Sequence, residues 1–224
     1  MASVQTYDYI AFYDLDHTIL TGNSATHLVE EARKRGVMSP GQYRHALYLS
    51  ILYKLGIGDP SRMITRMLSW LRGLPEPMVH RLCDEVFRKD LEQTIRPEIL
   101  EAIQMHRRQN GANVLLSSAT SPVCGPISGH LRLDDMICTF LETENGRFTG
   151  RTNGQLVFGM EKKVRMLAYC KQYGKDPAEA YYYGDSFTDQ YVMEAVGFPV
   201  AVSPDRRLLK IALKKNWPVL VNDR

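Results

Sequence analysis

Acidic side chains directly follow short apolar runs at two places in this 224-residue chain. Asp14 and Asp16 come after the run Tyr9–Tyr13, and Asp185 and Asp189 come after a second, tyrosine-rich run. A buried carboxylate without a partner is very costly, and several carboxylates at one rim repel one another. Mg²⁺ relieves that repulsion, because it takes one or two carboxylates and completes its shell with water and substrate phosphate. The four acids therefore predict a Mg²⁺ site that handles a phosphate group; the alternative is unrelated helix caps and surface acids.

The elements that would position these acids alternate between strands and helices. Helical patterns separate the apolar runs, for example from Pro97 to Asn110 and from Lys162 to Tyr173. Such alternation is typical of a doubly wound, mostly parallel, Rossmann-like sheet, whose ligand site lies outside the carboxyl ends of its strands. The sequence thus predicts an α/β fold with strands over Tyr9–Tyr13, Val114–Ser117, Ala180–Tyr183, Pro199–Val202 and Pro218–Val221. Ser118, just after the second strand, would join the acids at one rim.

Two segments depart from this alternation. Residues 136–152 contain the turn signal Glu144-Asn145-Gly146 and predict strands joined by a hairpin. Residues 21–95 predict helices without a strand between them, one from about residue 40 to a stop at Gly56 and others that start near Pro60 and Pro75. We therefore expect residues 1–20 and 96–224 to form a catalytic α/β core, and residues 21–95 to form an inserted α-helical cap subdomain.

Positive charge is concentrated in the predicted cap. The net charge is only +3, but residues 33–72 contain eight basic residues and one acid, Asp59. This segment should attract anions, although a solvated helical face would have the same composition. We expect no nucleic-acid partner, because the basic residues are not interleaved with aromatics and no groove-reading motif is present.

Composition excludes several protein classes. With 44% hydrophobic and 24% charged residues, the chain has the composition of a globular protein. The longest apolar-rich stretch, Leu47–Leu55, is about half of what a membrane span needs, and the first residues lack a basic leader. A cytoplasmic location is therefore expected. The four cysteines lack C-x-x-C spacing, so we expect reduced thiols rather than a zinc site or disulfides.

Four motifs occur in an order that resembles a known family. They are Asp14-Leu-Asp-His-Thr18, Leu115-Leu-Ser-Ser118-Ala-Thr120, Lys162-Lys163 followed by Val164, and Gly184-Asp-Ser-Phe-Thr-Asp189. Together they resemble the haloacid dehalogenase superfamily of phosphohydrolases, and within it the phosphoserine phosphatase-like branch, which inserts a helical cap between the first two motifs. The resemblance extends from about Tyr9 to Leu220.

The resemblance implies a role for each acid. Asp14 would be the nucleophile that attacks phosphorus and becomes an aspartyl phosphate. Asp16 would protonate the leaving oxygen and later activate water, and its presence favours a phosphatase over a dehalogenase, because a halide needs no acid. Asp14, the backbone carbonyl of Asp16 and Asp185 would hold Mg²⁺, with Asp189 orienting the ligands around it.

The resemblance also implies groups that bind the phosphoryl oxygens. Ser118 would donate a hydrogen bond to one of them. A lysine would neutralise charge on the phosphoryl group and on Asp14. Lys163 is favoured because it stands directly before Val164 and four residues before Leu167; Lys162 is the alternative.

Substrate choice depends on the cap. Phosphoserine phosphatases have, nine residues after the nucleophile, an acid that helps to recognise the substrate ammonium, whereas this chain has Asn23. Asn23, Arg62 and Arg66 are the candidate substrate residues of the cap. The basic cap suits a small anionic phosphomonoester, such as a sugar phosphate, a polyol phosphate or a nucleotide.

Two other functions remain as alternatives. One is a lipid-phosphate (phosphatidylglycerophosphate-like) phosphatase at a membrane surface, because seven of the nine residues in Leu47–Leu55 are apolar or Tyr. Cap core or a dimer face is the favoured explanation of that stretch, so a membrane partner is possible but not favoured, and the sequence allows a monomer or a homodimer. The more remote alternative is a phospho-accepting regulatory module. Asp16 speaks against it, because an acid there would speed loss of the phosphoryl group, and a regulatory module would not need a cap.

Overall fold

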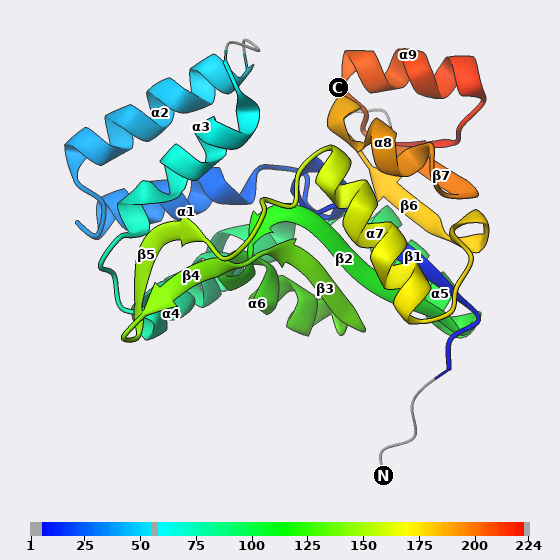
Figure 1. The fold of residues 1–224 in the computed structure, drawn as a ribbon, viewed down its shortest axis with the longest axis horizontal. Helices are drawn as coiled ribbons and strands as arrows, with labels where there is room; N and C mark the ends of the chain where they lie inside the picture. The colour runs from blue at the N-terminus through cyan, green and yellow to red at the C-terminus, as the bar shows by residue number, and fades with distance from the viewer. Residues whose placement is uncertain (1–5, 55–57, 222–224) are drawn as a thin grey trace.

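A six-stranded parallel sheet forms the centre of the computed structural model, which describes residues 6–54 and 58–221 (Figure 1). The strands are β1 (Tyr9–Tyr13), β2 (Gly111–Thr120), β3 (Asp135–Thr139), β6 (Tyr181–Gly184), β7 (Phe198–Val202) and β8 (Val219–Val221). Their order is β3-β2-β1-β6-β7-β8, so the chain winds outward on both sides of the boundary between β1 and β6. This arrangement confirms the predicted doubly wound α/β fold, and a ligand site is expected at the β1/β6 boundary.

Helices cover both faces of the sheet. α5 (Pro97–Arg108) and α6 (Ser121–Leu131) pack on one face, and α7 (Met160–Gln172), α8 (Gln190–Met193) and α9 (Arg206–Lys215) pack on the other (Figure 1). Side chains of β1 alternate between the two apolar clusters: Ile10 and Phe12 belong to the α7 side, and Ala11 and Tyr13 to the α5 side. Strands buried on both faces are near-continuous apolar runs, which is why β1 was predictable from its composition.

The segment between β1 and β2 is helical. It contains α1 (Ser24–Lys34), α2 (Pro40–Lys54), α3 (Pro60–Met67) and α4 (Glu76–Val86), and its described residues contain no strand. The predicted stop at Gly56 lies outside the described residues. The helix predicted to start near Pro75 is α4; it ends at Val86, and two short turns follow, Phe87–Leu91 and Glu92–Thr94.

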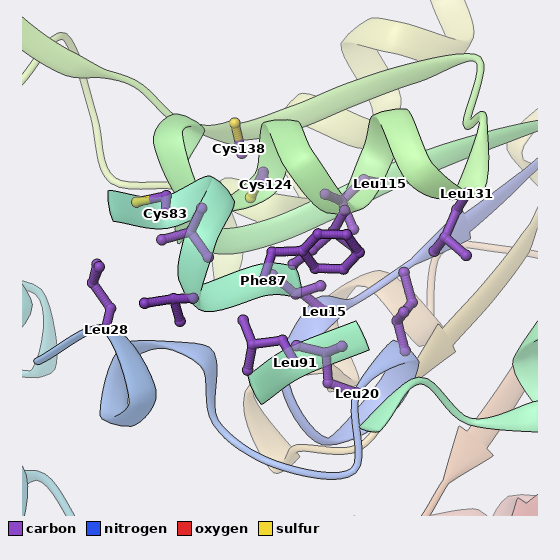
Figure 2. Close-up of a cluster of buried hydrophobic side chains, with 14 of the residues drawn as sticks. Leu15, Leu20, Leu28, Cys83, Phe87, Leu91, Leu115, Cys124, Leu131 and Cys138 are labelled. Atoms are coloured by element: carbon purple, nitrogen blue, oxygen red, sulfur yellow. The ribbon is translucent and has the colours of Figure 1, made fainter. Parts of the chain in front are cut away.

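This helical segment shares an apolar core with the sheet. Figure 2 shows the side chains that meet there, namely Leu15 and Leu20 after β1, Leu28 from α1, Phe87 and Leu91 after α4, Leu115 from β2 and Leu131 from α6. The predicted hairpin is present as β4 (Leu141–Glu144) and β5 (Arg147–Thr152), but residues 136–139, which were expected to belong to it, lie in β3 of the main sheet and pair in parallel with β2. The hairpin joins the helical segment, because the N–H of Gly73 donates to the carbonyl of Phe148 at 2.8 Å and the N–H of Phe148 donates to the carbonyl of Leu74 at 3.0 Å. The division into core and cap at residues 20 and 95 therefore stays a prediction.

No helix in the described part of the chain is both long enough and apolar enough to cross a membrane.

A buried histidine beneath the sheet leads to a prediction about stability. His106 is fully buried on α5, with Nδ1 2.8 Å from the hydroxyl of Tyr9 and Nε2 2.9 Å from the hydroxyl of Tyr183. Burial lowers the pKa of His106 to about 4, from its usual value of 6.5. Between these two pH values the unfolded chain takes up a proton that the folded chain does not, so acid favours unfolding. We expect this residue to cost about 2 kcal/mol of unfolding free energy as the pH falls from 7 to 4.5.

Urea unfolding at both pH values measures this effect, and His106→Gln provides the control because glutamine does not titrate. The loss of stability on acidification should be smaller in the variant than in the native chain. Equal losses in the two proteins would contradict the prediction.

Candidate active site

The carboxyl end of β1 holds the first acid of the site. The Asp14 N–H donates to the carbonyl of Tyr183 on β6 at 2.9 Å, which places Asp14 at the β1/β6 boundary. Asp185 directly follows β6, and Asp189 lies one turn later. Asp14, Asp185 and Asp189 are all buried, and one carboxylate oxygen of each lies within 4.8 Å of the others. The structure thus brings together three of the acids that the sequence placed at one rim.

The lysine of the site is Lys162. Its side chain is 4% exposed, and Nζ lies 2.9 Å from Oδ1 of Asp14 and 2.7 Å from Oδ1 of Asp189. The sequence favoured Lys163, which is half-buried at the next position of α7, but it is the alternative, Lys162, that contacts Asp14 and Asp189. The helical phase explains the difference. Met166 and Cys170, four and eight residues after Lys162, are the buried side chains of α7, whereas Val164 and Leu167, on which the choice of Lys163 relied, are exposed.

Burial and charge act in opposite directions on this cluster. Burial raises the pKa of Asp14 to about 6; Asp189 adds to the rise, and Lys162 opposes it. Burial alone would lower the pKa of Lys162, but the charges of Asp14 and Asp189 outweigh it and hold that pKa above its usual value. Lys162 is therefore charged at neutral pH and balances part of the negative charge of three carboxylates.

Asp189 is held from several directions. Its Oδ1 accepts from Lys162 Nζ at 2.7 Å and from the hydroxyl of Tyr182 at 2.8 Å, and its Oδ2 accepts from the N–H of Ser186 at 3.2 Å. These donors occupy Asp189 and fix its orientation. Sequence reasoning missed Tyr182, because a tyrosine in a buried strand has the pattern of a core residue and no spacing marks its hydroxyl.

The chemistry of the donor set suits a hard divalent cation. Three buried carboxylates, with one oxygen of each within 4.8 Å of the others, offer the oxygen ligands that Mg²⁺ prefers. The three protein donors to Asp189 favour a place for this carboxylate beside the ion rather than as its ligand.

Asp16 stands beside this cluster in a tight turn, Leu15–Ile19, in which His17 adopts the left-handed conformation (φ 60°). Its Oδ1 accepts from the N–H of Ser24 at 2.8 Å, and its Oδ2 accepts from Nδ2 of Asn23 at 3.2 Å. Burial raises the pKa of Asp16 above its usual value, and the Ser24 N–H opposes the rise.

Asn23 contacts Asp16, whereas the sequence predicted that it contacts the substrate. It was a candidate substrate residue, but its amide donates to Asp16, and its Oδ1 caps α1 by accepting from the N–H of Thr26 at 3.1 Å. The N-cap role was readable from Asn23 standing just before a helical run. Its bond to Asp16 depends on how the turn folds back, which no local pattern reveals.

Ser118 lies near the carboxyl end of β2 and is half-buried. The pairing of Tyr13 with Leu115 sets β2 beside β1 and brings Ser118 to the same end of the sheet as Asp14.

A cleft of about 720 Å³ lies between α3 and the loop before α7. Arg62, Thr65 and Arg66 line it from α3, and the other side is lined by Thr152, Gly154, Gln155, Leu156, Phe158 and Glu161. The two arginines predicted for substrate binding therefore share one cleft.

Comparison with known families identifies the chain. The haloacid dehalogenase-like hydrolase family matches residues 11–194. The chain belongs to this family. The resemblance and the enzymatic class predicted from the sequence are thereby confirmed.

This haloacid dehalogenase-like hydrolase is similar in sequence to several named proteins. It is 28% identical to the inhibition of morphological differentiation protein of Streptomyces azureus, over 94% of this chain and 77% of the relative. It is 28% identical to a probable phosphatase of Mycobacterium tuberculosis, over 94% of this chain and 74% of the relative. A histidinol-phosphatase of Neisseria meningitidis is 25% identical, over 94% and 97% of the two chains.

Solved structures support the same fold. A Bordetella pertussis protein of unknown function matches with a TM-score of 0.88 at 26% identity, over 97% of this chain and 100% of the other. A substrate-bound phosphoserine phosphatase matches with a TM-score of 0.73 at 16% identity, over 96% and 94% of the two chains. At that identity the second match shows a common fold.

Proposed function

We propose that this hydrolase is a Mg²⁺-dependent, cytoplasmic phosphomonoesterase that works through an aspartyl phosphate on Asp14. One observation carries the proposal: Asp14 is buried at a strand end with the Lys162 ammonium 2.9 Å away and Asp185 in the same cluster. The relatives named as phosphatases, and the match to a phosphoserine phosphatase structure, support it further.

In the first step an oxygen of Asp14 attacks phosphorus, and the bond between phosphorus and the leaving oxygen breaks. Asp16 gives its proton to that leaving oxygen, and its raised pKa favours the protonated form that this step needs. Lys162 and Ser118 bind phosphoryl oxygens, where negative charge is concentrated during transfer.

In the second step water attacks the phosphorus of the aspartyl phosphate. Asp16, now a carboxylate, takes a proton from this water, and the bond from phosphorus to Asp14 breaks. Inorganic phosphate leaves, and both carboxyl groups return to their starting forms. Asn23 and the Ser24 N–H hold Asp16 in place throughout.

Asp14, the backbone carbonyl of Asp16 and Asp185 would hold Mg²⁺, with Asp189 oriented beside them. When bound, the ion would offset negative charge on the phosphoryl group and on Asp14.

The proposed substrate is a small phosphorylated metabolite with a second anionic group, for which Arg62 and Arg66 would supply positive charge. Phosphate release from phosphoserine, histidinol phosphate, sugar phosphates, nucleotides and a short-chain lipid phosphate tests the proposal. Asp14→Asn serves as the blank. Activity on one class that disappears in the blank would support both reaction and substrate class, and a blank as active as the native chain would refute the mechanism.

Arg66→Ala should raise KM about tenfold for a substrate with a second anionic group, because the variant loses one charge-assisted hydrogen bond. It should leave KM for p-nitrophenyl phosphate within twofold, since this ester has no second anion. Steady-state kinetics on both esters measure the difference. Arg88→Ala, which removes an exposed arginine after α4, is the matched control. Equal changes in KM for the two esters would contradict the assignment.

A second candidate function, a lipid-phosphate phosphatase, is favoured by one surface feature. Leu47, Tyr48 and Ile51 on α2 are 52%, 57% and 49% exposed, with Arg44 and His45 exposed beside them; Leu55, at the end of the apolar stretch, lies outside the described residues. Apolar side chains beside an exposed arginine such as Arg44 suit an anionic membrane surface. Co-sedimentation with phosphatidylglycerol vesicles, lost in Leu47→Ser/Ile51→Ser and at high salt, would support this candidate; no binding to those vesicles would remove it.

A further inference from the structure

Tyr182 has a hydroxyl group inside the acidic cluster. The residue lies on β6 and is fully buried. Its hydroxyl donates to Oδ1 of Asp189 at 2.8 Å and accepts from Nζ of Lys162 at 3.3 Å. The side chain therefore bridges the ammonium and one of its two carboxylate partners.

These contacts make the Tyr182 hydroxyl part of the surroundings of Lys162. Its Nζ donates to Oδ1 of Asp189 at 2.7 Å and to the Tyr182 hydroxyl at 3.3 Å, and it forms an ion pair with Asp14, whose Oδ1 lies 2.9 Å away. The ammonium is thus held between two carboxylates that compete for it, and the shorter contact is the one to Asp189. Lys162 is expected to stay in contact with Asp14 only while Asp189 has another donor.

The backbone of β6 leaves room for this arrangement. A Cβ at Gly184 would lie 2.6 Å from Cε1 of Tyr182 and 3.0 Å from Oδ2 of Asp189. A side chain at residue 184 would therefore push the ring and the carboxylate away from their present positions. Glycine at this position allows the tyrosine ring to run beneath the strand end and reach Asp189.

We propose that Tyr182 is a positioning residue of the phosphatase reaction. By donating to Asp189, its hydroxyl prevents that carboxylate from drawing Lys162 away from Asp14 and the phosphoryl group. The inference rests on the proposed role of Lys162 in phosphoryl transfer. Without the hydroxyl, Asp189 Oδ1 would keep only Lys162 as a donor, and the ammonium would move toward Asp189.

The test is Tyr182→Phe, which removes one oxygen and keeps the ring. With p-nitrophenyl phosphate, kcat should fall about tenfold while KM stays within twofold, because the ammonium is misplaced but the binding cleft is untouched. Tyr181→Phe is the matched control, because Tyr181 lies on the same strand and packs on the opposite face of the sheet. It should leave kcat within twofold. Urea unfolding confirms that each variant is folded under assay conditions.

The same substitution in an Asp189→Asn background tests whether the effect passes through Asp189. In that background, adding Tyr182→Phe should lower kcat by less than a further twofold. The change in urea midpoint caused by Tyr182→Phe should also be smaller than in the native background. An unchanged kcat for Tyr182→Phe, or a tenfold loss repeated in full in the Asp189→Asn background, would overturn the proposal. Equal phosphate release by the native chain and Asp14→Asn would instead refute the proposed function, and the urea midpoints would still report whether the hydroxyl holds Asp189.

Discussion

Replacing Asp14 by Asn should abolish phosphate release, with kcat lower by about 10³-fold or more. The amide has nearly the shape of the carboxylate but cannot act as the attacking group, so no aspartyl phosphate can form. The side chain is buried at the end of β1 and fixed by the bond of its backbone to Tyr183, so the variant should fold. Phosphate release from the best substrate, with thermal unfolding of the same samples, measures the effect.

Asp16→Asn separates the two acids. It should also slow turnover of alkyl phosphates strongly, because their leaving oxygen must be protonated. The loss should be smaller for p-nitrophenyl phosphate, whose leaving group needs less protonation. Asp8→Asn, at an exposed position before β1, is the control and should keep native activity. If Asp14→Asn and Asp16→Asn both retained near-native turnover, the mechanism would be wrong.

Sequence patterns predicted the fold and the strand ends well, because burial on both faces makes each parallel strand a continuous apolar run. The prediction for β1, Tyr9–Tyr13, matches the structure. β2 begins three residues earlier than predicted, at Gly111 rather than Val114. Its early residues include Asn113, a polar but fully buried side chain whose Oδ1 accepts from the Tyr13 hydroxyl at 2.8 Å. A buried polar residue whose hydrogen-bond partner is far away in the sequence cannot be recognised from its neighbours in the sequence.

Contacts between side chains at the site were predictable only in part. The gathering of the acids was predictable, because the carboxyl ends of parallel strands meet at one edge of the sheet whatever rotamers the side chains adopt. The contacts of Asn23 and Tyr182 were not predictable, because the tertiary fold brings each of them close to its partner. Asn23 contacts Asp16, and Tyr182 contacts Asp189. The rotation of α7 about its axis determines which of the two adjacent lysines faces the acids. That rotation depends on which apolar residues of α7 pack against the sheet.

Adjacent lysines on α7 provide an internal comparison for the last prediction. Lys162→Met should lower kcat about 10³-fold, because the variant loses the cation that binds the phosphoryl group and Asp14. It should also destabilise the protein by about 3 kcal/mol, since the buried carboxylates of Asp14 and Asp189 would lose their shared ammonium. Methionine has a similar length, so lost volume contributes little. Phosphate release and urea unfolding measure the two effects.

Lys163→Met makes the same chemical change one residue later, at a half-buried position about 100° around the helix. Its kcat should stay within twofold, and its stability should change by about 0.5 kcal/mol or less. The pair therefore separates a role at the site from a general need for positive charge on α7. If Lys163→Met lost activity and Lys162→Met kept it, the lysine favoured by the sequence pattern would be the catalytic one, and the ammonium between Asp14 and Asp189 would serve only to balance buried charge.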